Sequence, residues 1–389
     1  MTPQTQQILD YLNNHKDVAV DFLVQLANTE SPSDNPEAIR QVFSILESGL
    51  ENAGLEVRRI SGQTMAATLY ARPPQNELKP HRQLLIGHCD TVWPISTLSS
   101  MPVVVEGDTI RGPGVFDMKG GLTQMIFALK TIHELELKPS VSPLVIINAD
   151  EEVGSPESSI VIRRFAPLAV RAFVLEPAFG TSGKLKTARK AVGRFHVIIQ
   201  GKPAHAGVNP QDGISAILEM SHQIQHLFAL NDASQGITVN VGTIDGGLRP
   251  NVIAPEVEAV LDVRVPTEAD ARRIESAIRG LRPINSGATI TVRGGFGRPS
   301  MEKSPRNQAL WKLARRLGET ELGLDLEQAA VGGASDGNTT SLHTATLDGL
   351  GAVGDGAHAH HEHLLISKMI ERTALLCLLL LSPPGSGPI

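Results

Sequence analysis

Three apolar runs, each of the kind that forms a buried strand, end in side chains that can bind a metal ion. The runs are residues 84–86, 143–148 and 172–175. The side chains that follow them are His88, Asp90, Glu151, Glu152 and Glu176. Because ligands bind at the carboxyl ends of the strands in open α/β sheets, we expect these side chains to converge on one site. Imidazole and carboxylate ligands suit zinc.

His88 and Asp90 are two residues apart, so on an extended chain they share a face, and one can bind a metal while the other holds its ring. The pair Glu151-Glu152 taken alone is more typical of a solvated turn, because exposed glutamate is common. Its position directly after a buried strand favours a functional site instead. Because neighbouring side chains diverge, one glutamate can bind metal while the other acts as a base.

Asp117 lies in the segment 111–121, RGPGVFDMKGG, where glycines and Pro113 predict an irregular approach to a helix. Capping preference alone favours a helix N-cap over a metal ligand for Asp117. In either role the amino end of the helix would favour the ionised carboxylate. The apolar face that predicts this helix consists of Leu122, Met125, Ile126, Leu129 and Ile132.

Helices and strands on either side of these motifs must form the sheet that carries them. Amphipathic patterns predict one helix over about 5–26, and a second that begins with Asp34 or Asn35 as its cap and ends at Gly54. The apolar run 374–381 is too short to span a bilayer and is typical of the buried end of a C-terminal helix. Further strands are predicted over 55–60, 65–70 and 107–110, and a later helix over Leu310, Leu313 and Leu317.

Residues 191–299 change pattern and predict a separate unit. Alternation and turn signals give the order βαββαβ, which is the order of a ferredoxin-like unit. A capping box at 267–270 begins its second helix. We therefore predict a mixed α/β sheet with helices on both faces, formed by residues 1–190 and 300–389, with an inserted domain at 191–299.

The composition of the 389-residue chain excludes several classes of protein. A net charge of −6 and only 4% aromatic residues argue against a nucleic-acid binder, which would be basic and rich in stacking platforms. Cys89 and Cys377 form no disulfide framework and fit a reducing compartment. The polar N-terminus has no apolar signal segment, and no apolar run is long enough for a membrane span. We therefore expect a cytoplasmic protein.

The order of five motifs resembles that of the two-metal peptidase family that contains aminoacylase and glutamate carboxypeptidase. The resemblance covers nearly the whole chain, with the insert between the fourth and fifth motifs. The glutamate carboxypeptidase branch is most similar, through the segments ARKAVGRF, GKPAHAG, GGASDGN and GLGAVGDGAHAHHEH. The five motifs are His88-x-Asp90, Asp117-Met118-Lys119-Gly120-Gly121, Glu151-Glu152, Glu176 and Ala357-His358-x-x-x-Glu362.

The resemblance implies two zinc ions, for which cobalt or manganese could substitute, bridged by Asp117. Asp90 would fix the ring of the first histidine. Glu151 would be the general base that takes a proton from the metal-activated water and passes it to the leaving nitrogen. The other implied ligands are His88 and Glu176 on one ion, and Glu152 and His358 on the second.

Residues of the insert have further implied roles. His205 would reach the active site of the partner subunit and stabilise the oxyanion. Asn251 would hold the scissile carbonyl, and Arg264 would pair its planar fork with the substrate carboxylate. From the residues alone, a loop histidine is more often structural, and the alternative for Arg264 is a charge on the surface of a strand. Gly333 and Ser335 lie in a segment that resembles the loop bordering the substrate pocket.

Together these implications predict a homodimeric zinc hydrolase, dimerised through the insert, that cleaves the amide bond before a C-terminal amino acid of a peptide or N-acyl-amino acid. Glu176 favours a carboxypeptidase or deacylase, because the family's aminopeptidases and dipeptidases usually have aspartate at that position. The alternatives are an N-acyl-amino-acid deacylase with the same site, a dipeptidase or aminopeptidase, and a non-catalytic metal-binding relative.

Overall fold

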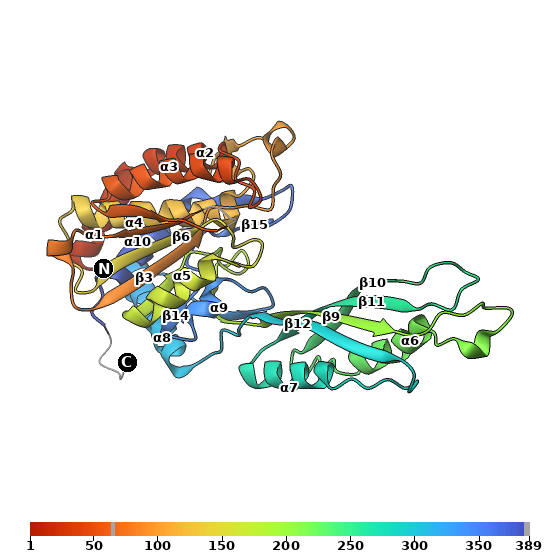
Figure 1. Ribbon diagram of the computed structural model, residues 1–389. Coiled ribbons are helices and arrows are strands. Elements are labelled where there is room, and N and C mark those ends of the chain that lie inside the picture. Colours follow the sequence, from red (N-terminus) through yellow and green to blue (C-terminus); the bar gives the residue numbers. More distant parts are fainter. Residues whose placement is uncertain (64–66, 385–389) are drawn as a thin grey trace. The chain divides into compact units, whose positions relative to one another are not determined.

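The structure is a computed structural model that describes residues 1–63 and 67–384. The chain divides into two compact units, which are labelled by element in Figure 1. Unit 1 contains Met1–Thr187, Lys303–Ala330 and the chain from Ser335 onward. Unit 2 contains Ala188–Glu302 and Val331–Ala334. Each unit is described by itself below.

The core of unit 1 is a six-stranded mixed sheet. Its strands are β1 Glu56–Ile60, β2 Thr68–Arg72, β3 Arg82–His88, β6 Ser142–Asn148, β7 Ala169–Val174 and β14 Ala345–Leu347. They lie in the order β1-β2-β6-β3-β7-β14, in which β6, β3, β7 and β14 are parallel and β2 is antiparallel to both neighbours. Parallel strands are buried on both faces, which explains the continuous apolar runs of β3, β6 and β7.

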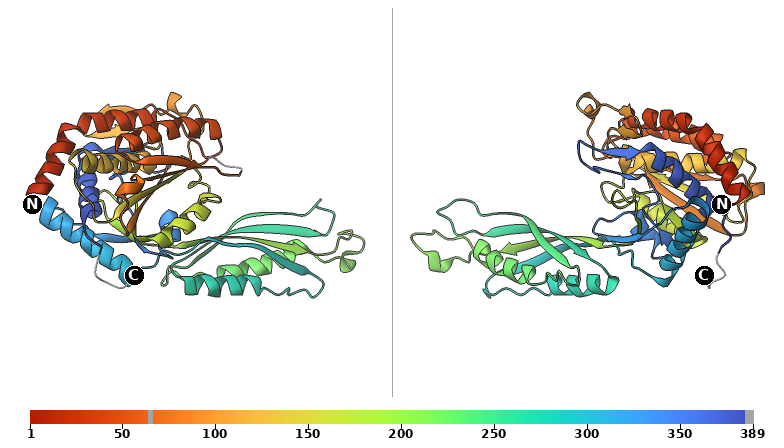
Figure 2. Two further views of the ribbon diagram at one scale, coloured as in Figure 1. Left: turned by 60° about the vertical axis from the view of Figure 1, so that its left-hand side comes forward. Right: turned by 180° about the vertical axis from the view of Figure 1, so that it is seen from behind.

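Helices cover both faces of this sheet, as predicted (Figures 1 and 2). They are α1 Pro3–Asn14, α2 Lys16–Ala27, α3 Pro36–Asn52, α4 Gly120–Glu134, α5 Ser158–Phe165 and α10 Ile366–Leu381. Successive residues of β3 face opposite sides. Leu85 packs into the core that α3, α4 and α10 share, whereas Leu84 and Ile86 pack with Ile162 of α5. This two-sided burial fixes the register of the strand that ends at His88.

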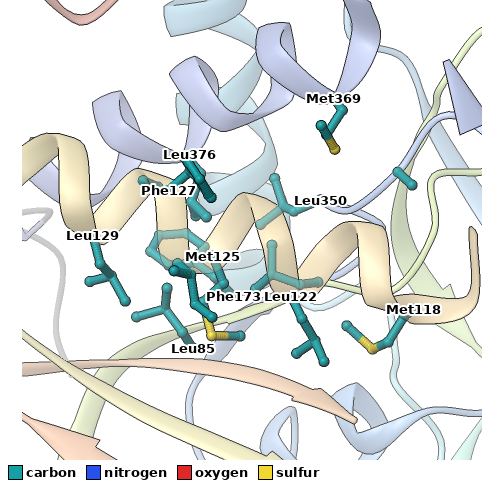
Figure 3. Close-up of a cluster of buried hydrophobic side chains, with 14 of the residues drawn as sticks. Leu85, Met118, Leu122, Met125, Phe127, Leu129, Phe173, Leu350, Met369 and Leu376 are labelled. Carbon is teal, nitrogen blue, oxygen red and sulfur yellow. The ribbon is translucent and has the colours of Figure 1, made fainter. Parts of the chain in front are cut away.

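Helix α4 connects the core to the metal-capable residues. Its apolar side chains lie against Leu85 and Phe173 of the sheet (Figure 3). At its first turn, a Cβ on Gly121 would lie 2.0 Å from the carbonyl oxygen of Leu175, so only glycine lets the helix start this close to the end of β7. The close approach brings the turn that precedes α4 next to the segment that follows β7.

The N-terminal helix prediction is wrong in one respect, because residues 5–26 form two helices rather than one. The break lies at His15, whose backbone leaves the helical region with φ −109° and ψ 13°. The next helix, α3, is capped by Asn35 and not by Asp34. The Asn35 side chain accepts a hydrogen bond from the Ala38 N–H at 3.1 Å.

Smaller elements surround this core. The strand predicted over 107–110 is the second half of a hairpin, because Gly107 has φ +58° and reverses the chain there. The strand predicted over 65–70 overlaps β2, and residues 65 and 66 lie outside the described residues. The remaining elements are β4 Val104–Glu106, β5 Thr109–Arg111, β8 Leu185–Arg189, α8 Pro305–Leu317, β13 Gln328–Val331, α9 Asp336–Thr340, β15 Gly354–Asp355 and β16 His363–Leu365.

Helix α10 contains the C-terminal apolar run, as predicted, and residues 374–380 are buried. The helix packs mainly against α4 and α1, so its apolar surface belongs to the core of unit 1. Over the part of the chain that the structure describes, we find no helix with the combined length and apolar character of a membrane span.

Unit 2 has the predicted order βαββαβ. Its elements are β9 Ala191–Gln200, α6 Ala216–Phe228, β10 Thr238–Gly246, β11 Glu256–Val265, α7 Glu268–Arg279 and β12 Thr289–Arg298. The strands form an antiparallel sheet in the order β10-β11-β9-β12. Inward-facing residues such as Phe195 and Leu261 pack with the helices into a core separate from that of unit 1. Thr267 caps α7 by accepting the Asp270 N–H at 3.0 Å.

Candidate metal centre

Strand β3 ends at His88, a buried residue with 1% of its surface exposed. Its Nδ1 lies 3.0 Å from the backbone carbonyl oxygen of Asp90. A carbonyl oxygen only accepts, so Nδ1 carries the proton in the neutral ring. The other nitrogen, Nε2, lies 3.3 Å from Oδ1 of Asp117 and 3.4 Å from Oε1 of Glu176. His88 is therefore oriented to bind a metal through Nε2.

Asp117 lies in a short π-helical turn, Val115–Lys119. It does not cap α4, because that helix begins at Gly120 and Lys119 occupies the N-cap position without a side-chain hydrogen bond. The capping role that residue preference favours is therefore wrong. Asp117 has φ −117° and ψ 98°, and its peptide bond to Met118 is cis. The irregular turn leaves the Asp117 carboxylate in the site rather than at the helix end.

The Asp117 carboxylate lies between two histidines. Its Oδ1 faces His88, and its Oδ2 lies 3.6 Å from Nε2 of His358. The same Nε2 lies 3.1 Å from Oε2 of Glu152. His358 has φ +61°, a left-handed conformation that bulky residues hold only where the surrounding structure enforces it, often at functional sites. The Asp117 carboxylate thus lies between two pairs of possible metal ligands, His88 with Glu176 and His358 with Glu152.

The spacing of these donor atoms fits metal ions. Two ligands of a tetrahedral zinc ion, each ~2.0–2.1 Å from it, lie roughly 3.3–3.4 Å apart. The four nitrogen-to-oxygen distances of the site are 3.3, 3.4, 3.6 and 3.1 Å. Oδ1 of Asp117 and Oε1 of Glu152 are buried, and neither has a hydrogen-bond partner among the described residues. Buried carboxylate oxygens without a donor are costly, and a bound cation would satisfy them.

Glu151 belongs to the same cluster. Its carboxylate, with ligand atoms of His88 and Glu176, forms one group whose atoms lie within 4.8 Å of one another. A second such group consists of His88, Asp117 and Glu152. The sequence predicts only a base at Glu151, and its position also allows metal contact. The two neighbouring glutamates therefore join different groups of the centre, as expected of diverging side chains.

The carboxylates of the site attract protons as well as cations. Burial lowers the pKa of His88, but the surrounding carboxylates, with Asp117 first among them, outweigh burial and hold that pKa well above its usual value. The hydrogen bond with Glu152 raises the pKa of His358 to about 9, against the effect of partial burial. A metal ion that binds both histidines must therefore displace protons near neutral pH.

The Asp90 carboxylate holds the turn that carries the two glutamates. Oδ1 accepts the backbone N–H of Glu151 at 3.3 Å, and Oδ2 accepts that of Glu152 at 3.1 Å. The hydroxyl of Ser33 donates to Oδ2 at 2.7 Å. The contact that fixes the His88 tautomer comes from the Asp90 main chain, while its Oδ1 lies 3.4 Å from Nδ1. Asp90 is thus placed to position the glutamate turn in addition to the histidine ring.

A buried network lies behind the glutamate turn. Asp336 accepts hydrogen bonds from the side-chain amide of Asn148, at the end of β6, and from the Ser155 hydroxyl at 2.6 Å. These two donors flank the residues between them, Ala149–Gly154, so Asp336 ties both ends of the turn. Sequence patterns did not identify Asp336, because its two partners are 188 and 181 residues away along the chain.

Ser335, predicted to border the substrate pocket, is fully buried. Its hydroxyl donates to Oδ2 of Asp348 at 2.6 Å and accepts the Gly337 N–H at 3.0 Å. Ser335 is the N-cap of α9 and forms a capping box with Asn338. These contacts give the hydroxyl a structural role at the start of α9.

Glu362 is a residue whose importance the sequence did not reveal. It is 1% exposed, and its carboxylate accepts four N–H donors. Oε1 accepts from Phe116 at 3.0 Å and Asp117 at 3.1 Å, and Oε2 accepts from Gly114 and from the indole of Trp93, both at 2.9 Å. Glu362 thereby fastens the Asp117 turn to the segment that carries His358. The only signal in the sequence was its spacing of four residues from His358.

His205 and Asn251 are neighbours in unit 2, where segments 205–206 and 251–252 pair through backbone hydrogen bonds. The Nδ1 of His205 accepts the N–H groups of Gly207 and Val208, both at 3.1 Å. Because Nδ1 is an acceptor, the neutral ring carries its proton on Nε2. His205 is therefore set as a hydrogen-bond donor through Nε2.

Arg264 also lies in unit 2. Its Nε donates to Oδ1 of Asp262 at 2.9 Å, and its Nη1 donates to the carbonyl oxygen of Gly332 at 3.1 Å. The carbonyl oxygen of Gly333 accepts from Nη1 of Arg189 at 3.0 Å. Arg264 and Arg189 thus hold residues 332–333 within unit 2. The functions of His205, Asn251, Arg264 and Gly333 in oxyanion stabilisation and substrate binding stay predictions.

Cys89 is fully buried, and burial raises the pKa of its thiol, so it behaves as a core residue. His360 and His361 are exposed, and the His360 ring centre lies 5.5 Å from that of Trp93.

Residues 187–282 match the model of a family described as peptidase dimerisation domain. Over 377 residues the chain is 26% identical to carboxypeptidase G2 from Pseudomonas sp. (strain RS-16), an alignment that covers 94% of this chain and 89% of that protein. The match therefore extends over both units.

Solved structures have a similar fold. Aminopeptidase PepT from Bacillus cereus gives a TM-score of 0.78 at 21% identity, covering 94% of this chain and 98% of that one. The YXEP protein of Bacillus subtilis, described as a dinuclear metal-binding peptidase of the M20 family, gives 0.68 at 14% identity, covering 95% and 98%. At these identities the likeness concerns the fold alone.

Proposed function

The chain belongs to the M20 peptidase family and is a hydrolase, and from that premise we propose that it cleaves the amide bond before a C-terminal amino acid. The observation that carries the proposal is the Asp117 carboxylate, whose two oxygens face two different histidines. That arrangement suits a pair of metal ions with one shared ligand. Carboxypeptidase G2, to which the chain is similar over most of its length, supports the choice of a carboxypeptidase.

We propose that Asp117 bridges two zinc ions, with cobalt or manganese able to replace them because the donors are imidazole and carboxylate. His88 and Glu176 would complete one side, and Glu152 and His358 the other. When bound, such ions polarise the scissile carbonyl and make a water molecule acidic enough to be deprotonated near neutral pH.

Within that site Glu151 is the general base. Its carboxylate removes a proton from the attacking water and then delivers the proton to the nitrogen of the leaving amino acid. The Asp90 carboxylate keeps Glu151 in place through its backbone N–H.

His205 supplies the second part of the chemistry, stabilisation of the oxyanion. The two backbone N–H groups on Nδ1 keep the proton of the neutral ring on Nε2, so the ring can donate to negative charge that develops on the carbonyl oxygen. By the family resemblance this donation comes from the partner subunit. Asn251, beside His205, would hold the same carbonyl.

Arg264 would bind the carboxylate of the leaving amino acid, with Gly333 and Ser335 in the segment that shapes this part of the pocket. Nη1 and Nε of Arg264 already have partners within unit 2, so a substrate carboxylate would share the guanidinium with Asp262. Such sharing makes the side chain rigid before substrate arrives.

A homodimer through unit 2 is part of the proposal. Strand β10 is at one end of the four-stranded sheet, so one of its edges is available for pairing. The adjacent helix α6 exposes Ile217, Leu218 and Phe228, and β10 itself exposes Ile244. The match to a peptidase dimerisation domain supports the use of this apolar surface between two copies. With two free cysteines, a reducing cytoplasmic location completes the proposal.

The test measures release of free amino acids from dipeptides, longer peptides and N-acyl-amino acids, with added zinc and after chelation. We expect chelator-sensitive release of one C-terminal residue. Glu151→Gln should retain its zinc and lose at least about a hundredfold in kcat. Release from small acyl groups alone would identify a deacylase, and release of N-terminal residues an aminopeptidase. No chelator-sensitive release from any substrate would refute the proposal.

The contribution of His205 in trans has its own test. Mixing Glu151→Gln with His205→Ala should recover activity by subunit exchange, because each mixed dimer contains one intact site. No recovery, with exchange confirmed, would show that His205 does not act across the dimer.

A further inference from the structure

Arg372, in helix α10, is a buried charge that has no counterion among the described residues. The side chain belongs to unit 1 and is 2% exposed, so its guanidinium is removed from water. The adjacent acidic residue, Glu371, forms its ion pair with Lys368 at 2.9 Å. No ion pair joins Arg372 to a carboxylate anywhere in residues 1–63 and 67–384.

Only one nitrogen of the Arg372 guanidinium has a partner in the described chain. Nη2 donates to the carbonyl oxygen of Gly183, whereas Nε and Nη1 are buried and have no acceptor there. Burial lowers the pKa of Arg372 to about 10, and the charge of Glu371 offsets this only in part. Arginine stays protonated at neutral pH, so a full positive charge and two N–H donors need a partner in the interior. A buried charge that lacks compensation is strongly destabilising.

Arg171 is the comparable buried arginine of unit 1, and all three of its nitrogens have acceptors. It is 3% exposed, and burial lowers its pKa to about 10 as well. Its Nε donates to Oε1 of Gln83 at 2.9 Å, and its Nη2 donates to the carbonyl oxygen of Ser382 at 2.7 Å. Its Nη1 lies 3.5 Å from the carbonyl oxygen of Pro383. The contrast indicates that Nε and Nη1 of Arg372 take an acceptor from outside the chain.

The surroundings of Arg372 limit the size of this acceptor. A Cβ on Gly183 would overlap Nη2 and would lie 2.9 Å from Cγ2 of the buried Val353, so the guanidinium is closely packed on this side. Gly183 lies in a turn whose ends, Phe179 and Lys184, exchange backbone hydrogen bonds at 2.9 and 3.0 Å. Residues 179–182 of this turn are exposed, so the turn that contacts Arg372 has solvent on its other side. A small ion can enter when the turn opens, whereas a large organic anion does not fit beside a 2% exposed side chain.

We propose that Arg372 binds a small monovalent anion such as chloride through its Nε and Nη1 groups. A halide accepts hydrogen bonds from any direction and carries the single negative charge that balances one guanidinium. The anion would neutralise the interior of unit 1 where α10 contacts the turn 179–184. The site shares no residue with the candidate metal centre, so the inference does not depend on the proposed function.

Bromide diffraction tests the site directly. Crystals of the zinc-loaded protein are soaked in sodium bromide, and the anomalous signal locates the bound ions. We expect a bromide peak within hydrogen-bond distance of Nε or Nη1 of Arg372, and no such peak in crystals of Arg372→Met. A water molecule at these nitrogens, or no bound atom, would overturn the proposal.

Thermal unfolding, followed by the fluorescence of Trp93 and Trp311 in unit 1, gives the corresponding measurement in solution. Sodium chloride is compared with sodium methanesulfonate, whose anion is too large for the site, at equal ionic strength so that screening is the same. The wild-type Tm should be about 2–4 °C higher in chloride, the shift expected when chloride is about fivefold above its Kd. Arg372→Met, which replaces the charge by an unbranched apolar chain, should have the same Tm in both salts.

The matched control is Arg171→Met. It removes a buried arginine whose nitrogens already have acceptors, so the Tm should fall in both salts while the difference between the salts keeps its wild-type value. No chloride effect in the wild type, or an equal chloride effect in Arg372→Met, would rule out the anion site. If Arg372→Met does not fold, the bromide map of the wild type decides.

Discussion

Replacing Glu362 by glutamine removes the charge that fastens the Asp117 turn and changes the shape of the side chain little. The Glu362 carboxylate accepts four N–H groups, two on each oxygen. Glutamine has one acceptor oxygen, and its NH₂ group would face two donors. Whichever way the amide is turned, two of the four hydrogen bonds are lost.

The magnitude follows from this count. A buried N–H left without an acceptor costs about 1–3 kcal/mol, so Glu362→Gln should lower the free energy of unfolding of unit 1 by about 2–6 kcal/mol. Either orientation of the glutamine amide leaves a backbone N–H beside Asp117 without an acceptor. This is the Asp117 N–H when the NH₂ group replaces Oε1, and the Gly114 N–H when it replaces Oε2. Because groups that orient a ligand typically contribute 10–100-fold to metal affinity, we expect a loss of that order.

The assay separates stability from metal affinity. Both tryptophans, Trp93 and Trp311, belong to unit 1, so urea unfolding followed by tryptophan fluorescence reports that unit. Zinc affinity is measured by competition with a chelator. The control is Glu219→Gln in unit 2, where a 2% exposed carboxylate accepts the N–H groups of Ile284 and Asn285, both at 2.9 Å.

The control removes the same kind of buried acceptor far from any proposed ligand in sequence. It should destabilise unit 2, as seen by circular dichroism, and leave both the fluorescence transition and the zinc affinity at their wild-type values. Wild-type zinc affinity in folded Glu362→Gln would refute the positioning role. So would an equal loss of affinity in Glu219→Gln.

Two further predictions concern protons and the glutamate turn. Because the pKa of His358 is raised to about 9, zinc must displace a proton below that pH, and zinc affinity measured by chelator competition should rise from pH 6 to pH 9. In the presence of a chelator, the stability of the metal-free protein should depend on pH in the opposite direction. The stability that the raised pKa of His358 provides is complete below pH 6.5 and is lost as the pH rises through about 9. A urea midpoint that does not change over this pH range would contradict the prediction. Asp336→Asn loses one of two acceptors, so it should cost about 1–3 kcal/mol in urea unfolding. It should also lower kcat more than it changes KM, and an unchanged kcat would contradict its role behind the glutamate turn.

Local patterns were sufficient for the strands that carry the site. The apolar runs at 84–86, 143–148 and 172–175 lie in or next to β3, β6 and β7, because a buried parallel strand leaves a continuous apolar signal. The order βαββαβ of the insert was equally readable, since alternation has a period of two and an amphipathic helix one of 3.6. The helix break at His15 could not be predicted from the sequence, because the apolar pattern continues across it.

The parts of the site that escaped prediction depend on contacts between distant segments. Glu362 lies 245 residues after Asp117, and no periodicity within either segment indicates that they meet. The N-cap expectation for Asp117 failed for a related reason: the residue has the right type and place for a cap, and only the start of α4 at Gly120 shows that it is not one. The tautomers of His88 and His205 are likewise set by backbone atoms that sequence does not place.

The way unit 2 interrupts unit 1 has a consequence for synthesis of the chain. Arg189 and Met301, near the two ends of the insertion, exchange a pair of backbone hydrogen bonds at 2.9 and 3.0 Å, so the insertion starts and finishes at one point. The six strands of unit 1 need β14, at residues 345–347, which leaves the ribosome after all of β9 to β12. Unit 2 is almost continuous and has its own core, so it can fold while unit 1 still lacks an edge strand and helix α10. Unit 1 must therefore wait, partly assembled, until β14 and α10 have been synthesised.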